Sequence, residues 1–177
     1  MTHQLPEVWM RGPIEGIPSL LQPVAHALLQ VGEELPRHLA GFPDEWLWIS
    51  PGNKASAGFH LQHMTGVIDR LFTYARNEML NDQQMAWLTM EGKENAALSV
   101  EQLIDLFNRE VESALTQLRR TDIRELTNAR YIGRKRIPTT LIGLLFHTAE
   151  HTMRHNGQLL VTAAWVRSLH NGHTETG

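Results

Sequence analysis

The sequence predicts an all-α protein, a four-helix bundle with one extra short helix. Apolar residues recur at three- and four-residue steps over long segments, which is the spacing of a single buried helix face. Strict alternation of β-branched residues between turn signals, the pattern of a half-buried strand, is not found, so we expect no strand. With 42% hydrophobic and 20% charged residues, the 177-residue chain is expected to form one domain, residues 1–177.

The first half of the chain predicts two long helices joined by an aromatic loop. The first helix is expected at about residues 18–39, where Pro23 interrupts the apolar stripe and indicates a kink or a late start. The loop that follows contains Trp46 and Trp48, whose large side chains are expected to anchor it onto the bundle. The second helix is expected at about residues 54–77.

The second half shows clear helix-start signals. Asn81 with Gln84 three residues later predicts the capping box of a short third helix, and Ser99 with Gln102 predicts the same box for the fourth. Proline suits the first position of a helix, so the last helix is expected to begin at Pro138 and to continue to about residue 169.

Composition excludes several classes of function. The net charge of −3 gives no basic footprint for nucleic acid, and we interpret the basic run 134–136 as a loop that leads into a helix. Cysteine is absent, so metal ligands must be imidazole or oxygen. No apolar stretch approaches the roughly 20 residues that span a bilayer, and the segment 1–6 does not resemble a signal peptide. We therefore expect a cytoplasmic protein without nucleic-acid or membrane partners.

Five of the 10 histidines lie in two short segments. His151 and His155 are four residues apart on the core stripe of the last helix, so both side chains can converge on one ion. His147 precedes them by another four residues and sits at the edge of the stripe; it would be about 12 Å along the axis from His155, too far to share an ion. A buried imidazole needs a partner on both nitrogens, and a metal supplies one.

A third ligand must come from another helix. His60 and His63 lie three residues apart on the expected second helix, and only one of them is needed. Three protein ligands would leave one position for water, which is the arrangement of a catalytic rather than a structural zinc site.

These histidine segments resemble the signature of the DinB/YfiT-like (DNA-damage-inducible) superfamily. The resemblance is strongest in the segment HTAEHTMRHNGQ at 147–158 and in GFHLQHMTGVIDRL at 58–71. The segments 133–143 and 9–13 are also similar to one branch of the family.

The resemblance implies a four-helix bundle, often a homodimer, with a zinc or nickel ion held by three histidines. The family motif matches His151 and His155. Its ligand on the second helix precedes a small-apolar stretch that ends at an acidic residue, here Asp69, which favours His63 and keeps His60 as the alternate.

One position departs from the family pattern. The residue after the last ligand is often basic in the family, and here it is Asn156, followed by Gly157. Asn-Gly is normally a turn signal, but the apolar pattern resumes after it, so we expect an unbroken helix. Gly157 is then expected to let another helix or a ligand approach the backbone.

The resemblance implies either metal-assisted hydrolysis of a small molecule or a transfer that uses a low-molecular-weight thiol. The alternative is a non-catalytic, stress-linked dimeric bundle that binds metal. No residue is predicted to be catalytic: Glu150 is turned about 100° from the ligand face of its helix. Asp69 is expected to face away, as a cap or in an inter-helix pair, and Arg70 and Arg154 are expected to be solvated surface charges.

Overall fold

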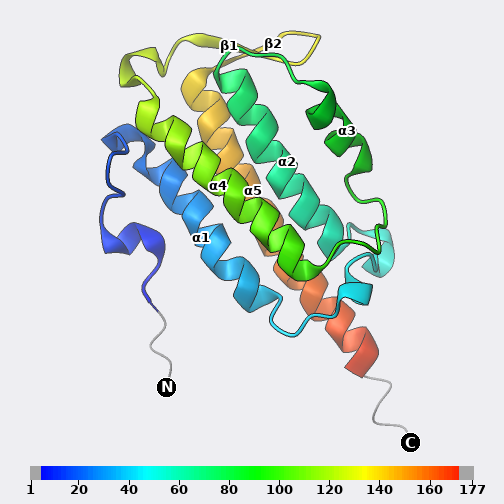
Figure 1. Ribbon diagram of the computed structural model, residues 1–177. Coiled ribbons are helices and arrows are strands. Elements are labelled where there is room, and N and C mark those ends of the chain that lie inside the picture. Colours follow the sequence, from blue (N-terminus) through cyan, green and yellow to red (C-terminus); the bar gives the residue numbers. More distant parts are fainter. Residues whose placement is uncertain (1–4, 172–177) are drawn as a thin grey trace, which may run out of the picture.

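Four long helices pack side by side, and a fifth, short helix lies outside them beside the second (Figure 1). The structure is a computed structural model that describes residues 5–171; the ends of the expected domain, 1–4 and 172–177, lie outside the described residues. In the bundle α1 contacts α4 and α5, and α2 contacts the same two helices, so the four form a ring. The expected all-α fold is confirmed. The helices are α1 (Gln22–His38), α2 (Ala57–Ala75), α3 (Asp82–Met90), α4 (Val100–Arg120) and α5 (Leu141–Asn171).

The apolar stripes that predicted the helices form one core. Leu28 of α1, Leu61 of α2, Phe107 of α4 and Leu144 of α5 are each no more than 1% exposed. Truncating a buried side chain of this size to alanine typically costs about 2–5 kcal/mol, so these contacts set the relative positions of the helices.

The helix starts follow their sequence signals. Helix α1 begins at Gln22, after a short 3-10 turn at Ser19–Leu21, and Pro23 lies in its first turn, so the late start is confirmed. Helix α2 begins later than expected because Ser56 caps it, accepting a hydrogen bond from the amide of Phe59 at 3.1 Å.

Both expected capping boxes are present. The backbone amide of Gln84 donates to Oδ1 of Asn81, and the backbone amide of Asn81 donates to Oε1 of Gln84, each at 2.9 Å. Ser99 and Gln102 make the same reciprocal pair at the start of α4.

The expectations of a helix start at Pro138 and of no strand are wrong. The segments β1 (Ala129–Ile132) and β2 (Ile137–Thr140) form a short antiparallel hairpin, and α5 begins only at Leu141. Proline also fits a two-stranded hairpin, where a missing amide donor is tolerated at an edge, and strands of four residues are too short to show alternation. The basic run is the hairpin turn, in which Arg136 has a φ of 48° and lies over the Tyr131 ring.

Aromatic side chains anchor the loop between α1 and α2, as expected. The Trp46 ring stacks on the ring of His170 near the end of α5, with centroids 4.1 Å apart. Trp48 packs against Gly58 so closely that a Cβ there would lie 2.6 Å from its ring.

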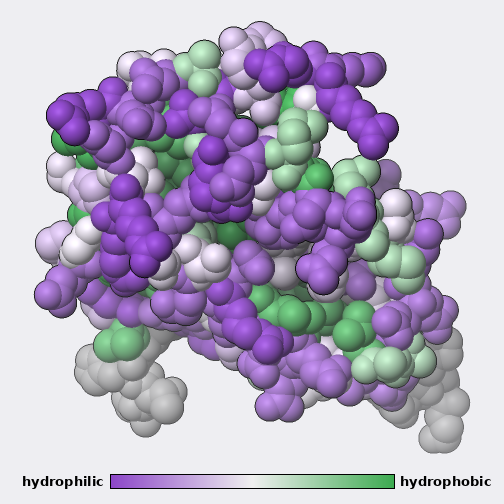
Figure 2. Space-filling model, turned by 45° about the horizontal axis from the view of Figure 1, so that its top comes forward, coloured by the Kyte–Doolittle hydropathy of each residue, from purple (hydrophilic) through white to green (hydrophobic). Residues whose placement is uncertain are grey.

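Helix α5 is continuous through Gly157. No other described helix approaches the backbone at Gly157, although the sequence led us to expect one or a ligand there. A Cβ at Gly157 would meet no described atom within 4 Å. Hydrophilic residues cover most of the face that Figure 2 shows, with apolar residues in separate small patches. Within residues 5–171, no helix is both long and apolar enough to cross a membrane.

Candidate metal centre

Three histidines from two helices converge between α2 and α5. His63 of α2 meets His151 and His155 of α5, and one ring nitrogen of each lies within 4.8 Å of the others. The Nε2 atoms of His63 and His151 are 2.9 Å apart. The four-residue spacing puts His151 and His155 on one face of α5, and the neighbouring α2 supplies the third ring.

His60 lies behind this group and not in it. Its Nδ1 atom is 3.0 Å from Nδ1 of His155, so one of these two nitrogens donates a proton and the other accepts it. His60 is 3% exposed. The structure therefore groups His63 with the helical pair, and His60 contacts His155 without belonging to the group.

His147 is exposed and belongs to a surface cluster. Its Nδ1 atom lies 2.7 Å from Oε1 of Glu150, and Arg154 pairs with the same carboxylate at 2.7 Å. His147, Glu150 and His151 form a second group that could hold a metal ion. Glu150 is already paired with two cationic or polar partners, and half of the Arg154 side chain is exposed, which agrees with the surface charge expected from the sequence.

Burial keeps His151 and His155 uncharged at neutral pH. It is the main cause that lowers the pKa of His151 to about 4 and the pKa of His155 to about 3, and the nearby His63 lowers both further. Burial likewise lowers the pKa of His60 to about 4. A metal ligand must offer a lone pair, so neutral rings are the form that binds an ion.

Sequence reasoning missed the groups that surround His63. Its Nδ1 atom lies 2.7 Å from Oε2 of Glu91, the residue after α3, and Phe59 stacks on its ring with centroids 5.0 Å apart. Arg70, expected to be a solvated surface charge, is 8% exposed and pairs with Glu91. Arg70 lies two helical turns from His63, a weak signal for a shared face; no spacing relates Glu91 to either residue.

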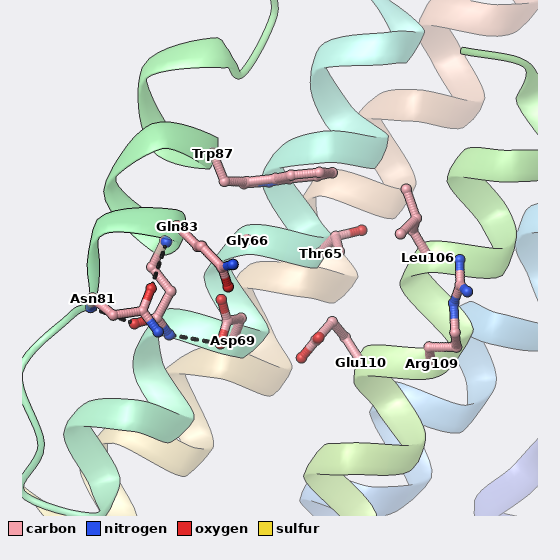
Figure 3. A pocket seen from close by; sticks show the side chains of 10 residues that line it. Thr65, Gly66, Asp69, Asn81, Gln83, Trp87, Leu106, Arg109 and Glu110 are labelled. Carbon is pink, nitrogen blue, oxygen red and sulfur yellow. Dashed lines mark hydrogen bonds between the residues drawn. The ribbon is translucent and has the colours of Figure 1, made fainter. Parts of the chain in front are cut away.

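Asp69 takes part in an inter-helix contact, one of the two roles expected for it. Its Oδ1 atom accepts a hydrogen bond from Nε2 of Gln84 on α3 at 2.7 Å. Asp69 and Glu110 of α4 both point into a cavity of about 410 Å³ between α2, α3 and α4, which the ring of Trp87 covers (Figure 3). None of the converging histidines lines this cavity.

The three-histidine group fits a divalent metal ion. All its donors are imidazole nitrogens, which suit zinc and nickel among the common metals. The Nδ1 atom of His151 is buried and has no hydrogen-bond partner among the described residues. The other nitrogen of this ring, Nε2, is the one that faces His63, so the unpaired Nδ1 atom does not itself mark the position of an ion. The group could hold a metal ion.

Comparison with known proteins assigns the chain to a family. No curated protein matches it. The family model described as the DinB superfamily matches residues 27–159, which include most of the bundle and all three converging histidines. The chain belongs to the DinB superfamily.

Proposed function

We propose that this protein is a metal-dependent enzyme that acts on a small molecule, either as a hydrolase or as a transferase that uses a low-molecular-weight thiol. The observation that carries the proposal is the convergence of His63, His151 and His155 within 4.8 Å. Zinc or nickel is the proposed ion, because the ligand set is all imidazole and the chain has no cysteine.

The number of ligands favours catalysis over a purely structural site. Structural zinc sites are usually closed by four protein ligands, whereas catalytic ones keep a position open. His60, the other histidine of α2, has its Nδ1 atom on His155 and is not in the group. A divalent ion in such a site can lower the pKa of a bound water to about 7 or polarise a substrate oxygen or sulfur.

The three-histidine group is partly exposed to solvent and partly covered by a neighbouring aromatic ring. The side chain of His63 is 19% exposed, and His151 and His155 are half-buried, so a small molecule can reach the group from solvent. Phe59 covers one face of the His63 ring. Electrostatic interactions are stronger in such a partly water-excluded place than in bulk water.

The alternative is a non-catalytic metal-binding dimer. A surface on α5 supports a dimer for both the enzyme and this alternative. Positions 146, 153 and 160 of α5 are seven residues apart and lie on one outward side of the helix. Large exposed apolar side chains gather on a self-complementary face in many homodimers. We propose that a second copy of the chain covers this face. Its exposed apolar residues are Phe146, Met153 and Leu160.

Elemental analysis of the purified, untagged protein tests the metal site. We expect about one divalent ion per chain in the wild type and in His147→Ala, and none in the double variant His151→Ala/His155→Ala. The His147 variant removes a ligand of the second possible group, His147, Glu150 and His151, so metal that this variant retains is assigned to the converging group. Wild-type protein that takes up no metal after incubation with zinc or nickel would refute the proposal.

The open coordination position can be tested separately with cobalt-substituted protein. We expect a small anion such as azide to change the visible absorption of the cobalt ion, since one position should exchange its ligand. An absorption spectrum that no anion changes would indicate full coordination by protein and favour the non-catalytic alternative. Metal-loaded protein would then be screened with simple esters, amides and thiols paired with electrophiles.

A further inference from the structure

The two ring nitrogens of His63 face different partners. Nδ1 lies 2.7 Å from Oε2 of Glu91, and Nε2 lies 2.9 Å from Nε2 of His151. A carboxylate accepts hydrogen bonds, so the proton of the neutral ring belongs on Nδ1. The lone pair is then on Nε2, the atom that faces the other two histidines.

The carboxylate of Glu91 is itself held in place. Its Oε1 atom pairs with Nη1 of Arg70 at 2.5 Å, and the two side chains are only 5% and 9% exposed. One oxygen therefore contacts a guanidinium and the other an imidazole. With both oxygens engaged, the carboxylate has little freedom to rotate away from His63.

Gly66 provides the space for this ion pair. His63, Gly66 and Arg70 are three and four residues apart, so they lie along one side of α2. A Cβ at Gly66 would collide with the charged ends of Arg70 and Glu91 and would lie 2.7 Å from Cδ1 of Trp87. The missing side chain therefore allows the end of α3 to approach α2.

Polar contacts fix the end of α3 where the carboxylate is needed. Within α3 only Gln84 is buried, so apolar packing does little to place this helix. Nε1 of Trp87 donates to the carbonyl of Gln62 at 3.0 Å, and the amide of Gly92 donates to Oε1 of Gln62 at 2.8 Å. These contacts lie on both sides of position 91 in the sequence, so they fix its backbone against α2.

We propose that Glu91 is a positioning residue that fixes the tautomer and orientation of His63, so that Nε2 is presented to a divalent metal ion. Arg70 holds Glu91 for this task. The inference rests on the proposed metal function and deepens it. Glu91 acts through His63 and does not bind the ion. Carboxylates that orient a ligand histidine commonly contribute 10- to 100-fold to metal affinity.

The tautomer of His63 in metal-free wild-type protein is the first test. Two-dimensional ¹⁵N–¹H spectra at neutral pH distinguish a proton on Nδ1 from one on Nε2, and His63→Gln identifies the signal. We expect the proton on Nδ1. Finding it on Nε2 would overturn the inference, and because this measurement uses the native chain it does not depend on how any Glu91 variant folds.

Metal affinity is the second test, by zinc titration against a competing chelator. We expect Glu91→Gln to bind zinc 10- to 100-fold more weakly, and Glu91→Asp, which keeps a carboxylate, to recover part of the loss. Glu94→Gln is the matched control, since Glu94 is an exposed carboxylate three residues away. Circular dichroism checks that each variant is folded.

The outcomes separate this inference from the proposed function. A folded Glu91→Gln variant that binds zinc as tightly as the wild type would overturn the role of Glu91 and leave the metal site intact. Wild-type protein that binds no zinc would instead refute the proposed function. The tautomer measurement would then still decide whether Glu91 sets the proton position on His63.

Discussion

The Nε2 atoms of His63 and His151 lie 2.9 Å apart, although the two residues are 88 positions apart in the chain. Their meeting depends on the packing of α2 against α5, which also buries Leu61 and Leu144. Without a metal ion, one of these two nitrogens can donate a hydrogen bond to the other. An ion between α2 and α5 would instead join two helices, so it should affect both stability and chemistry.

Removing the metal is expected to lower the melting temperature. A ligand that binds only the folded state at 100 times its dissociation constant stabilises it by about 2.7 kcal/mol, or roughly 5–10 °C for a chain of this size. Differential scanning calorimetry of zinc-loaded protein with and without EDTA measures the shift. The variant His151→Ala/His155→Ala should melt at the same temperature in both buffers, and an equal shift in that variant would point to zinc bound elsewhere.

Gly66→Ala is expected to destabilise the protein even though alanine is the better helix former. The helix propensity of alanine favours the folded state by about 1 kcal/mol, whereas overpacking in a filled interior costs about 1–3 kcal/mol. The added Cβ would lie 2.7 Å from Trp87 and would press on the pair Arg70–Glu91. Urea unfolding measures the sign of the change, and a more stable variant would show that α3 can move away without cost.

Glu110→Gln is expected to stabilise the protein at neutral pH but not at pH 4. Burial, and then the nearby Asp69, raises the pKa of Glu110 above its usual 4.5. Below pH 4.5 the carboxyl group is protonated in both the folded and the unfolded state, so it has no effect. As the pH rises, the unfolded state loses the proton first and the folded state is disfavoured, a penalty that glutamine avoids. Thermal melts at pH 4 and pH 7 measure the difference.

The control for this prediction is Glu112→Gln, on the exposed side of the same helix. It should change stability little at either pH, since surface substitutions usually stay within about 0.5 kcal/mol. A Glu110→Gln variant that gains as much stability at pH 4 as at pH 7 would show that packing, and not charge, is responsible.

Leu160→Glu is expected to convert a dimer into a monomer. The substitution places a charge in the apolar α5 face that we propose a second copy covers, and burying an unpaired charge is costly. Light scattering after gel filtration should give twice the mass of one chain for the wild type and the mass of one chain for the variant. Leu88→Glu on α3 is the matched control, since these leucines are 43% and 41% exposed. A monomeric wild type would refute the proposed dimer.

Local signals were sufficient for much of the fold and for half of the site. The capping boxes at Asn81 and Ser99 were predictable because all their atoms lie within three residues. The pair His151 and His155 was predictable because helix geometry alone puts residues four apart on one face. The hairpin before α5 was missed, since four-residue strands carry too few positions to show a period.

The sequence by itself determined the helices, their buried faces and the ligand pair on α5, because each depends on interactions within a few turns of one helix. Only the tertiary structure decided which second-helix histidine joins that pair, since the rotation of α2 against α5 places His63 in the group and His60 behind it. It also brought Glu91 to His63 and buried Arg70 beside it. The docking of α3 sets these contacts, and no spacing along the chain encodes the position of one helix against another.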